Sequence, residues 1–460
     1  MSIPQGGEGP LTPSAVWRDV AGSVRHGGLR EQYWAAIRFL GRLGRLARPA
    51  NRAFASVVVK SYEDFLLGRA RPVRGQTRQR MDAAVGWLLR AQDATPDDGV
   101  AYGYFPADAG TSGWLPSYPE TTGYIIPSLL EYTALHSDAS IRERAQRMAL
   151  WETTIQMPTG AVQAGRVCPP EQRRPAVFNT GMVLQGYVAL LFEREDKQIA
   201  DGARRAAEFL LGDMRRDGHF QTHGPCVTAH QVKTYNCLCA WPLYRFGLLT
   251  GEHRCMDAAI RAVEAAVGEQ TPNGWFAHNS LDRPEAPLTH TIGYTLQGIL
   301  EVGFLACRED FVASVERTAR ALLARITPTG FLHGRFRADW TPACSSSCLT
   351  GSAQIAGVLY RLFEHTADLC YREGADRIVD FLKALQMVHS SNPALSGALA
   401  GSFPVLGEYM PGGYPNWATK YFLDALMLQD RVSNSRDVSG RIRGHASHAG
   451  APLNRPGVTV

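Results

Sequence analysis

Apolar and polar positions recur along the chain in two kinds of helical segment. One kind is amphipathic: in "SIRERAQRMALWETTI", Ile141, Ala145, Met148 and Ile155 form an apolar stripe, while arginines and acids fill the other face. The other kind is apolar or small on several faces, which predicts burial on several sides. Its six examples are "ETTGYIIPSLLEY", "FNTGMVLQGYVALLF", "KTYNCLCAWPLYRFG", "THTIGYTLQGILEVG", "CLTGSAQIAGVLYRLF" and "NWATKYFLDALMLQ".

A glycine turn precedes each of these apolar segments. The intervals between successive glycines are 61, 58, 56, 56 and 67 residues, a regularity that unrelated turns would not keep. The glycines are Gly99, Gly160, Gly218, Gly274, Gly330 and Gly397, and the threonines near the segment starts are Thr122, Thr180, Thr234, Thr291, Thr350 and Thr419. Each unit is therefore an outer amphipathic helix, a glycine turn, a loop and an inner buried helix.

Six hairpins whose inner helices are buried all round can cover that surface by closing into a ring. We therefore predict an all-α (α/α)6 toroid over residues 76–430, with twelve main helices in two concentric rings. The chain shows no long alternation of apolar and polar residues, so strand signals are thin. An open α-solenoid is the alternative, but six units with buried inner helices favour closure.

The two ends of the chain lie outside the repeat. Residues 1–75 are predicted to hold N-terminal accessory helices, including a basic amphipathic helix at 29–47 with Arg38, Arg42 and Arg45 along one face. That helix either docks on the toroid or lies on an anionic membrane surface or partner. Residues 431–460 are polar and rich in glycine, proline and serine, which predicts a disordered tail.

Composition narrows the class of protein. Of the 460 residues, 45% are hydrophobic, and the net charge of +5 is too small to argue for nucleic acid as a partner. Nine scattered cysteines, an odd number, suit reduced thiols and a cytoplasmic protein, peripheral to a membrane if 29–47 binds lipid. The first residues lack a secretory signal, and no apolar run is long enough to span a membrane.

Candidate site residues gather where the inner helices begin, because in a closed ring all six N-termini line one mouth. Glu120, His290 and Tyr235 are the predicted catalytic residues. The predicted substrate-binding residues are Trp114, Tyr118, Asn179, His230, Lys233, Asn236, Trp275, Glu408, Tyr414, Asn416, Trp417 and Lys420. Structural alternatives stand beside several of these: a helix cap for Asn179, a wedge between hairpins for Trp275, and a core histidine for His290.

Glu120 is the centre of this prediction. A carboxylate between Pro119 and Thr121 at a helix tip has little packing role. The helix dipole favours its ionised form, so its pKa is expected to fall, although burial beside Trp114 and Tyr118 would raise it.

The chemistry of the mouth fits a sugar-like ligand. Aromatic faces can stack on pyranose rings, polar side chains can bind hydroxyl groups, and the helix N-termini favour anionic groups. We therefore expect an acidic, uronate-containing glycan. No metal or cofactor is expected, since the cysteines form no CxxC pairs and no nucleotide-binding glycine motif occurs.

The six hairpins, the glycine turns and the aromatic mouth resemble the six-hairpin glycosidase superfamily. Over residues 76–430 they also resemble (α/α)6 proteins of bacterial exopolysaccharide biosynthesis, of the VpsJ-like and prenyltransferase-repeat type, through "SYPETTGY", "CLTGSAQ" and "YMPGGYPNWATKYF". The glycosidases imply an acid, usually with a second carboxylate. Related glucuronyl C5-epimerases and polysaccharide lyases imply proton abstraction beside a uronate carboxylate.

We therefore expect a carbohydrate-active enzyme, a glycoside hydrolase or a lyase or C5-epimerase, acting on an acidic oligosaccharide or polysaccharide precursor. A hydrolase would pair Glu120 with Glu408, Glu285 or Asp339. A lyase or epimerase would use Glu120, His290, Tyr235 and the lysines. The alternatives are a terpene cyclase or prenyltransferase, for which no DxDD or DDxxD motif occurs, and a glycan-binding scaffold without catalysis.

Overall fold

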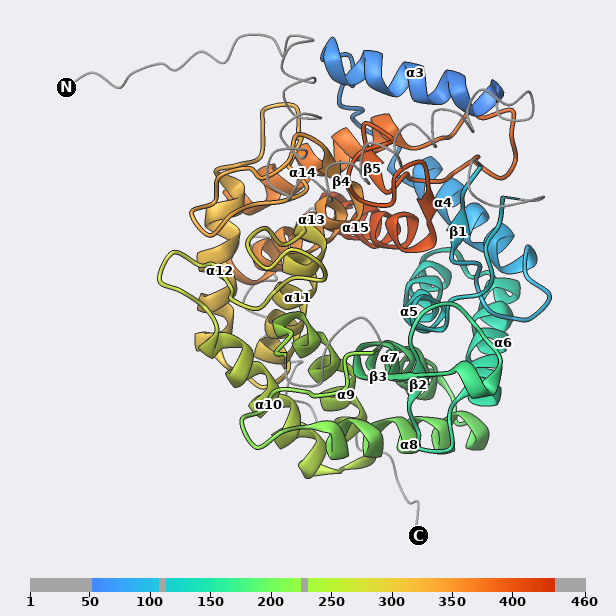
Figure 1. Cartoon of the computed structure of the whole chain (residues 1–460), viewed down its shortest axis with the longest axis vertical. Helices are drawn as coiled ribbons and strands as arrows, with labels where there is room; N and C mark the ends of the chain where they lie inside the picture. Colours follow the sequence, from blue (N-terminus) through green and yellow to red (C-terminus); the bar gives the residue numbers. More distant parts are fainter. Residues whose placement is uncertain (1–51, 107–112, 225–230, 435–460) are drawn as a thin grey trace, which may run out of the picture.

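The computed structural model describes residues 52–106, 113–224 and 231–434. Within these ranges six helices form an outer ring and six form an inner ring (Figure 1). The outer helices are α4 (Thr77–Asp93), α6 (Ala139–Ile155), α8 (Lys197–Asp213), α10 (His253–Gly268), α12 (Glu309–Leu323) and α14 (Leu369–Leu385). The inner helices are α5 (Pro119–His136), α7 (Val177–Glu193), α9 (Ala240–Thr250) with the 3-10 turn η3 (Thr234–Cys239) before it, α11 (Thr289–Leu305), α13 (Leu349–Thr366) and α15 (Asn416–Asn434).

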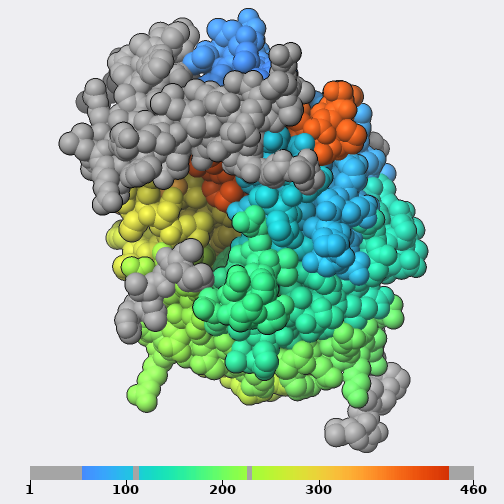
Figure 2. Space-filling view, turned by 45° about the vertical axis from the view of Figure 1, so that its right-hand side comes forward, coloured from blue at the N-terminus to red at the C-terminus, as the bar shows by residue number. Residues whose placement is uncertain are grey.

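The ring is closed. The last inner helix, α15, packs against α13 on one side and against α4 and α5 of the first unit on the other. Figure 2 shows the early part of the chain, coloured blue to green, as one continuous wall. The predicted all-α toroid is therefore confirmed, and the open solenoid is not found.

Short two-residue strands join the loops that precede inner helices. The pairs, all antiparallel, are β1 (Gly103–Tyr104) with β6 (Tyr414–Pro415), β2 (Val162–Gln163) with β3 (Pro175–Ala176), and β4 (Ser347–Cys348) with β5 (Ser402–Phe403). A short 3-10 turn, η2 (Pro170–Gln172), lies between β2 and β3. The pairing of β1 with β6 fastens the first unit to the last at the mouth.

The outer helices follow the amphipathic pattern of the sequence. In α6 the predicted stripe of Ile141, Ala145, Met148 and Ile155 is buried. Aspartates begin three of the outer helices and accept a hydrogen bond from a backbone N–H of the first turn, which satisfies a donor that has no partner in the helix. These caps are Asp138, Asp196 and Asp368.

The glycine turns seat each unit on the outer helix of the next. Five of the six repeated glycines have φ between 85° and 91°, a conformation that side chains disfavour. A Cβ on Gly330 would lie 1.9 Å from the carbonyl oxygen of Arg377 in α14, and one on Gly397 would lie 2.0 Å from that of Ala83 in α4. The second contact joins the last unit to the first. These glycines therefore determine how closely neighbouring units of the ring can pack.

The repeated threonines tie the inner helices to the glycine turns. In three units the threonine hydroxyl of the first helical turn accepts a hydrogen bond from a backbone N–H just after the glycine. The pairs are Thr122 with Val100, Thr180 with Val162 and Thr419 with Leu399, at 2.9, 2.9 and 3.0 Å. In these units the threonine serves the local fold.

One further helix, α3 (Arg52–Leu66), lies outside the two rings at the upper edge of Figure 1. Phe54 packs edge-on against Tyr414 with ring centroids 6.4 Å apart, and Phe65 packs against Phe403 at 5.6 Å. Both partners belong to the loop that precedes α15, so α3 is docked on the mouth side of the toroid.

Two predicted segments lie outside the described residues. They are the basic helix at 29–47 and residues 435–460 of the tail, while α15 itself continues to Asn434, beyond the expected boundary at 430. Over 52–106, 113–224 and 231–434, no helix has the length and apolarity needed to cross a membrane.

We expect Gly330→Ala to destabilise the fold by at least about 2 kcal/mol, because it adds both a strained φ and a clash with the Arg377 carbonyl. Urea unfolding measures the change. The matched control is Gly212→Ala inside α8, where a Cβ meets nothing within 4 Å. This control should leave stability unchanged or raise it by up to about 1 kcal/mol, and equal stability of both variants would contradict the role given to the turn.

Candidate functional site

The candidate site is the mouth at which all six inner helices begin. Glu120 is the second residue of α5, and its side chain points into a closed environment with only 9% of its surface exposed. The hydroxyl of Tyr118 donates a short hydrogen bond to Glu120 Oε2. Glu120 is therefore a buried carboxyl group with a phenol as its hydrogen-bond donor.

Burial decides the protonation of Glu120. Desolvation raises the pKa of its carboxyl group from the usual 4.5 to about 7, and the hydrogen bond from Tyr118 opposes this only in part. The expectation that the helix dipole would lower the pKa is wrong, because the dry surroundings outweigh the partial charge of the helix end. At neutral pH the protonated and ionised forms coexist, so Glu120 can both give and take a proton.

Aromatic rings surround Glu120 and include two of the predicted binding residues, Tyr118 and Trp417. The ring of Tyr102 lies 5.2 Å from that of Tyr118 and 4.7 Å from that of Trp417. The Trp417 indole N–H donates to the hydroxyl of Tyr409 at 2.7 Å. The four side chains come from the loops before α5 and α15 and from α15 itself, so first and last units build this part together.

His290, on α11, adjoins the same cluster through Tyr409, whose ring centroid is 5.2 Å away. Burial lowers the pKa of His290 to about 4, so its imidazole is neutral at pH 7. Its Nδ1 lies 2.8 Å from Gln354 Oε1. Because an amide oxygen only accepts, Nδ1 carries the proton and Nε2 is left as a hydrogen-bond acceptor.

A charged group built around Arg335 lies beside the aromatic cluster. Arg335 is 3% exposed, donates two hydrogen bonds to Asp282 at 2.7 and 3.0 Å, and donates a third to Glu408 at 3.0 Å. Arg283 also pairs with Glu408, at 3.2 Å. Glu408, predicted to bind substrate or to act as a second catalytic carboxylate, is thus engaged by two guanidinium groups.

Three of the predicted substrate-binding residues belong to the third unit. Lys233 donates to the carbonyl of Ser280 at 2.6 Å, and burial lowers its pKa although Asp282 opposes this. Asn236 bonds the ring of His223 at 2.7 Å. His230 lies outside the described residues.

Tyr235 and Lys420 are both buried, at 6% and 2% exposure. Tyr235 packs against Phe178 at 5.6 Å. Lys420 pairs with Asp424 at 2.7 Å and lies 4.0 Å from the ring of Tyr421, one turn deeper in the ring than Glu120. Lys420 is therefore a buried, paired cation.

Other predicted binding residues take part in packing. Trp275 lies edge-on to Trp340 at 5.4 Å, which fits the interpretation of a wedge between hairpins. Tyr414 is 1% exposed, and Trp114 packs against Trp87 of α4 at 5.4 Å. These contacts are away from the Glu120 carboxyl group.

Two predicted asparagines hold the loops of the mouth. Asn179 donates to the carbonyl of Gln163, and Asn416 to that of Ala101, both at 2.8 Å. Asn179 is the third residue of α7 and Asn416 the first residue of α15, so each ties the start of an inner helix to a loop of the mouth. Of the proposed second carboxylates, Glu285 and Asp339 are exposed at the surface.

Sequence reasoning overlooked two contributions. Tyr124, Tyr294 and Tyr421 meet in the centre of the inner ring, with Tyr421 5.5 Å from Tyr124 and 6.0 Å from Tyr294. Each follows a repeated threonine by two or three positions, a signal that could have found them. Arg166 lies 5.8 Å from the centre of the Tyr102 ring, in a loop without any repeat signal.

Within the described ranges, no group of three or more His, Cys, Asp or Glu side chains is arranged to hold a metal ion.

Comparisons with known proteins identify the fold. No family model and no curated protein sequence matches the chain. An unsaturated glucuronyl hydrolase specific for heparin matches with a TM-score of 0.62 and 16% identity, over 78% of this chain and 97% of that chain. The enzyme from Bacillus sp. GL1, described as responsible for the degradation of glycosaminoglycan, matches with a TM-score of 0.61, 16% identity and the same coverage.

A third solved structure, the unsaturated glucuronyl hydrolase of Streptococcus agalactiae, matches with a TM-score of 0.58 and 12% identity, over 76% of this chain and 91% of that chain. At such identities the likeness shows a shared glycosidase-type helical toroid. The exopolysaccharide and prenyltransferase-repeat part of the resemblance stays a prediction.

The raised pKa of Glu120 predicts a pH-dependent effect of Glu120→Gln on stability. A carboxyl whose folded pKa lies above its unfolded value stabilises the fold below about pH 4.5, and this contribution is lost as the pH rises through 7. Above pH 7 the wild type therefore holds a buried charge at a cost of about 3 kcal/mol, which the neutral amide avoids.

We expect Glu120→Gln to be more stable than the wild type at pH 8 and to lose that advantage at pH 5. The free energy of unfolding in urea at the two pH values measures this. An equal loss of stability at both would instead indicate that the carboxylate serves as a structural ion or hydrogen-bond partner.

Proposed function

We propose that this protein is a carbohydrate-active enzyme that cleaves a glycosidic bond in an acidic, uronate-containing oligosaccharide. The observation that carries the proposal is Glu120, a carboxyl group held by Tyr118 at an aromatic mouth, with a pKa of about 7. A general acid–base is most effective when its pKa lies near the working pH. The similarity in fold to hydrolases that act on unsaturated glucuronyl groups supports the choice of substrate class.

In the proposed reaction Glu120 supplies both proton transfers. Its protonated form gives a proton to the oxygen that leaves when the glycosidic C–O bond breaks. The resulting carboxylate accepts a proton from the water that attacks the sugar, so the group returns to its starting state. Tyr118 keeps its hydroxyl on Glu120 and orients it, while His290 is neutral and offers Nε2 as an acceptor.

Recognition of the sugar is assigned to the aromatic side chains and Arg166. Tyr102 is half-buried and can offer its ring to a pyranose, and the guanidinium of Arg166 lies beside it. Arg166 is exposed, and no ion pair within the described residues involves it. A guanidinium without a carboxylate partner suits the carboxylate of a uronate.

Two other reaction classes share this site. A lyase or C5-epimerase would use ionised Glu120 to take the proton next to the uronate carboxylate, and product analysis separates these outcomes from hydrolysis. Rings such as Tyr102 and Trp417 could also stabilise a carbocation in an isoprenoid enzyme, which screening with prenyl diphosphates tests. A role in bacterial exopolysaccharide metabolism, a cytoplasmic location and membrane contact through 29–47 stay predictions.

On uronate oligosaccharides we expect Glu120→Gln to lower kcat/KM by about 100- to 10,000-fold, because the amide cannot transfer the proton. The rate of reducing-end release by the folded variant measures this. Glu285→Gln is the matched control, since it removes an exposed carboxylate and should keep wild-type activity. Full activity of Glu120→Gln would remove Glu120 from the reaction.

Arg166→Gln should raise KM for a uronate substrate by about 10- to 100-fold and leave kcat nearly unchanged, since it removes an ionic contact made equally before and during the reaction. Initial rates over a range of substrate concentrations separate the two constants. Arg216→Gln, an equal change of charge at an exposed position after α8, serves as the control. An unchanged KM in Arg166→Gln would assign the uronate carboxylate to other groups.

A further inference from the structure

A cavity lies inside the ring, on the side away from Glu120. Its volume is about 310 Å³, and all six inner helices contribute to its wall. On α5 the wall begins at Pro127 and reaches Glu131, which the helical rise places about 16 Å further along the helix than Glu120. The cavity therefore opens toward the C-terminal ends of the inner helices, whereas the candidate active site lies at their N-terminal ends.

Several polar side chains of the cavity wall form no hydrogen bond within the described residues. Gln185 is 4% exposed, yet within the described residues its side chain makes no hydrogen bond. In the same part of the chain, the amide of Gln297 and the indole N–H of Trp241 also have no hydrogen-bond partner. Gln185 is buried, and a buried amide left in this way is costly unless something else binds it, whereas Gln297 and Trp241 are half-buried. Amides from α7 and α11 and an indole from α9 thus converge on one space.

The charged side chains of the wall form ion pairs. Lys420 pairs with Asp424 at 2.7 Å and Arg361 pairs with Glu301 at 3.0 Å. The third cation, Arg431, contacts Glu131 at 3.4 Å and, more closely, Glu364 beside the cavity at 2.7 Å. Three cations and three carboxylates line the cavity, so its formal charge is zero. An anionic ligand would have to compete with carboxylates that are already in place.

We infer that this cavity binds a small neutral polyhydroxylated molecule, of the size of one monosaccharide. Amides offer both a donor and an acceptor, which matches neighbouring hydroxyl groups, and the Trp241 ring supplies an aromatic surface. The volume lies at the lower end of small-molecule sites, which run from about 300 to 1,000 Å³. This inference does not depend on the proposed function, because the cavity wall contains none of Glu120, Tyr118 and Arg166, on which that function rests.

One residue connects the cavity to the candidate active site. Gln354 lines the cavity, and its Oε1 accepts the hydrogen bond from His290 Nδ1. A ligand that draws on the Gln354 amide therefore acts on the orientation of His290. A ligand in the cavity can thus affect the mouth through this one hydrogen bond.

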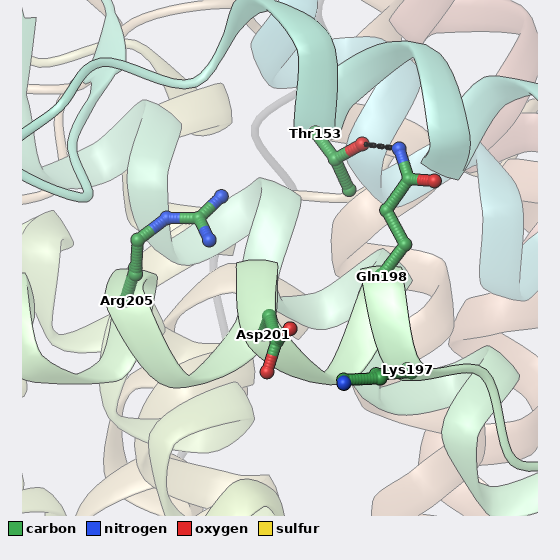
Figure 3. Close-up of a pocket in the computed structure, with 5 residues that line it drawn as sticks. All are labelled: Thr153, Lys197, Gln198, Asp201 and Arg205. Carbon is green, nitrogen blue, oxygen red and sulfur yellow. Dashed lines mark hydrogen bonds between the residues drawn. The ribbon is translucent and has the colours of Figure 1, made fainter.

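A larger hollow on the outer surface provides the contrast. Between α6 and α8, a hollow of about 380 Å³ is lined by Thr153, Lys197, Gln198, Asp201 and Arg205 (Figure 3). There the amide of Gln198 already donates to Thr153 at 2.6 Å. Because this amide already has a partner, the same substitution at this place is a suitable control.

The test measures binding of glucose, galactose, rhamnose and N-acetylgalactosamine to the full chain by titration calorimetry, with glucuronate as the anionic comparison. At least one neutral sugar should bind the protein saturably with a Kd of about 1 mM or tighter. Glucuronate should bind the protein more weakly than that sugar does. Gln297→Met should weaken this binding by about 2- to 10-fold, the loss of one or two hydrogen bonds, and Gln198→Met should not change it.

Trp241→Phe keeps an aromatic ring and removes the N–H, so it repeats the test if Gln297→Met does not fold. The inference is overturned if no neutral sugar binds saturably, or if binding survives unchanged in both cavity variants. Loss of the binding in Glu120→Gln would place the sugar at the mouth and would overturn it as well.

Discussion

The close approach that glycine permits between neighbouring helices is the constraint on which the rest of this structure depends. At the outside, Gly330 and Gly397 let their turns rest on backbone carbonyls of the next outer helix. Inside, a Cβ on Gly186 of α7 would lie 2.4 Å from the carbonyl oxygen of Gly123 in α5, and one on Gly351 of α13 would lie 2.5 Å from the backbone nitrogen of His290 in α11. Larger residues at these positions would push the helices apart and open the ring.

The dry centre follows from that closeness, and the chemistry of Glu120 follows from the dry centre. A charge at a helix N-terminus is stabilised by about 0.3–1 kcal/mol, and up to about 2 kcal/mol where it is partly buried. A rise of the Glu120 pKa from 4.5 to about 7 corresponds to about 3 kcal/mol in the opposite direction. Desolvation therefore exceeds the dipole, and a tightly closed toroid produces a carboxyl group that is ready to exchange protons at neutral pH.

Much of the fold could be predicted from the sequence, because period and spacing are properties of the chain itself. The α6 stripe at Ile141, Ala145 and Met148 and the glycine interval each constrain a local conformation, and six repeats leave few ways to bury the inner helices. Which residues belong to the site could not be predicted in this way, because that depends on how each helix is rotated about its axis. Tyr124 and Trp275 carry equally aromatic side chains, yet one faces the centre and the other fills a joint between hairpins.

A ring of parallel helices has two unlike ends, and the charges of this chain follow that difference. Six N-termini at one mouth favour anions, and there Arg166 has no carboxylate partner among the residues that the structure describes. At the opposite end the helix C-termini favour cations, and Arg431 in the last turn of α15 occupies such a place. Glu364 at 2.7 Å and Glu131 at 3.4 Å then neutralise it, which leaves hydrogen bonding as the means of recognition in that cavity. Gln354 lines the cavity and bonds His290 at the mouth, so each end can select a ligand by its own chemistry while sharing this side chain.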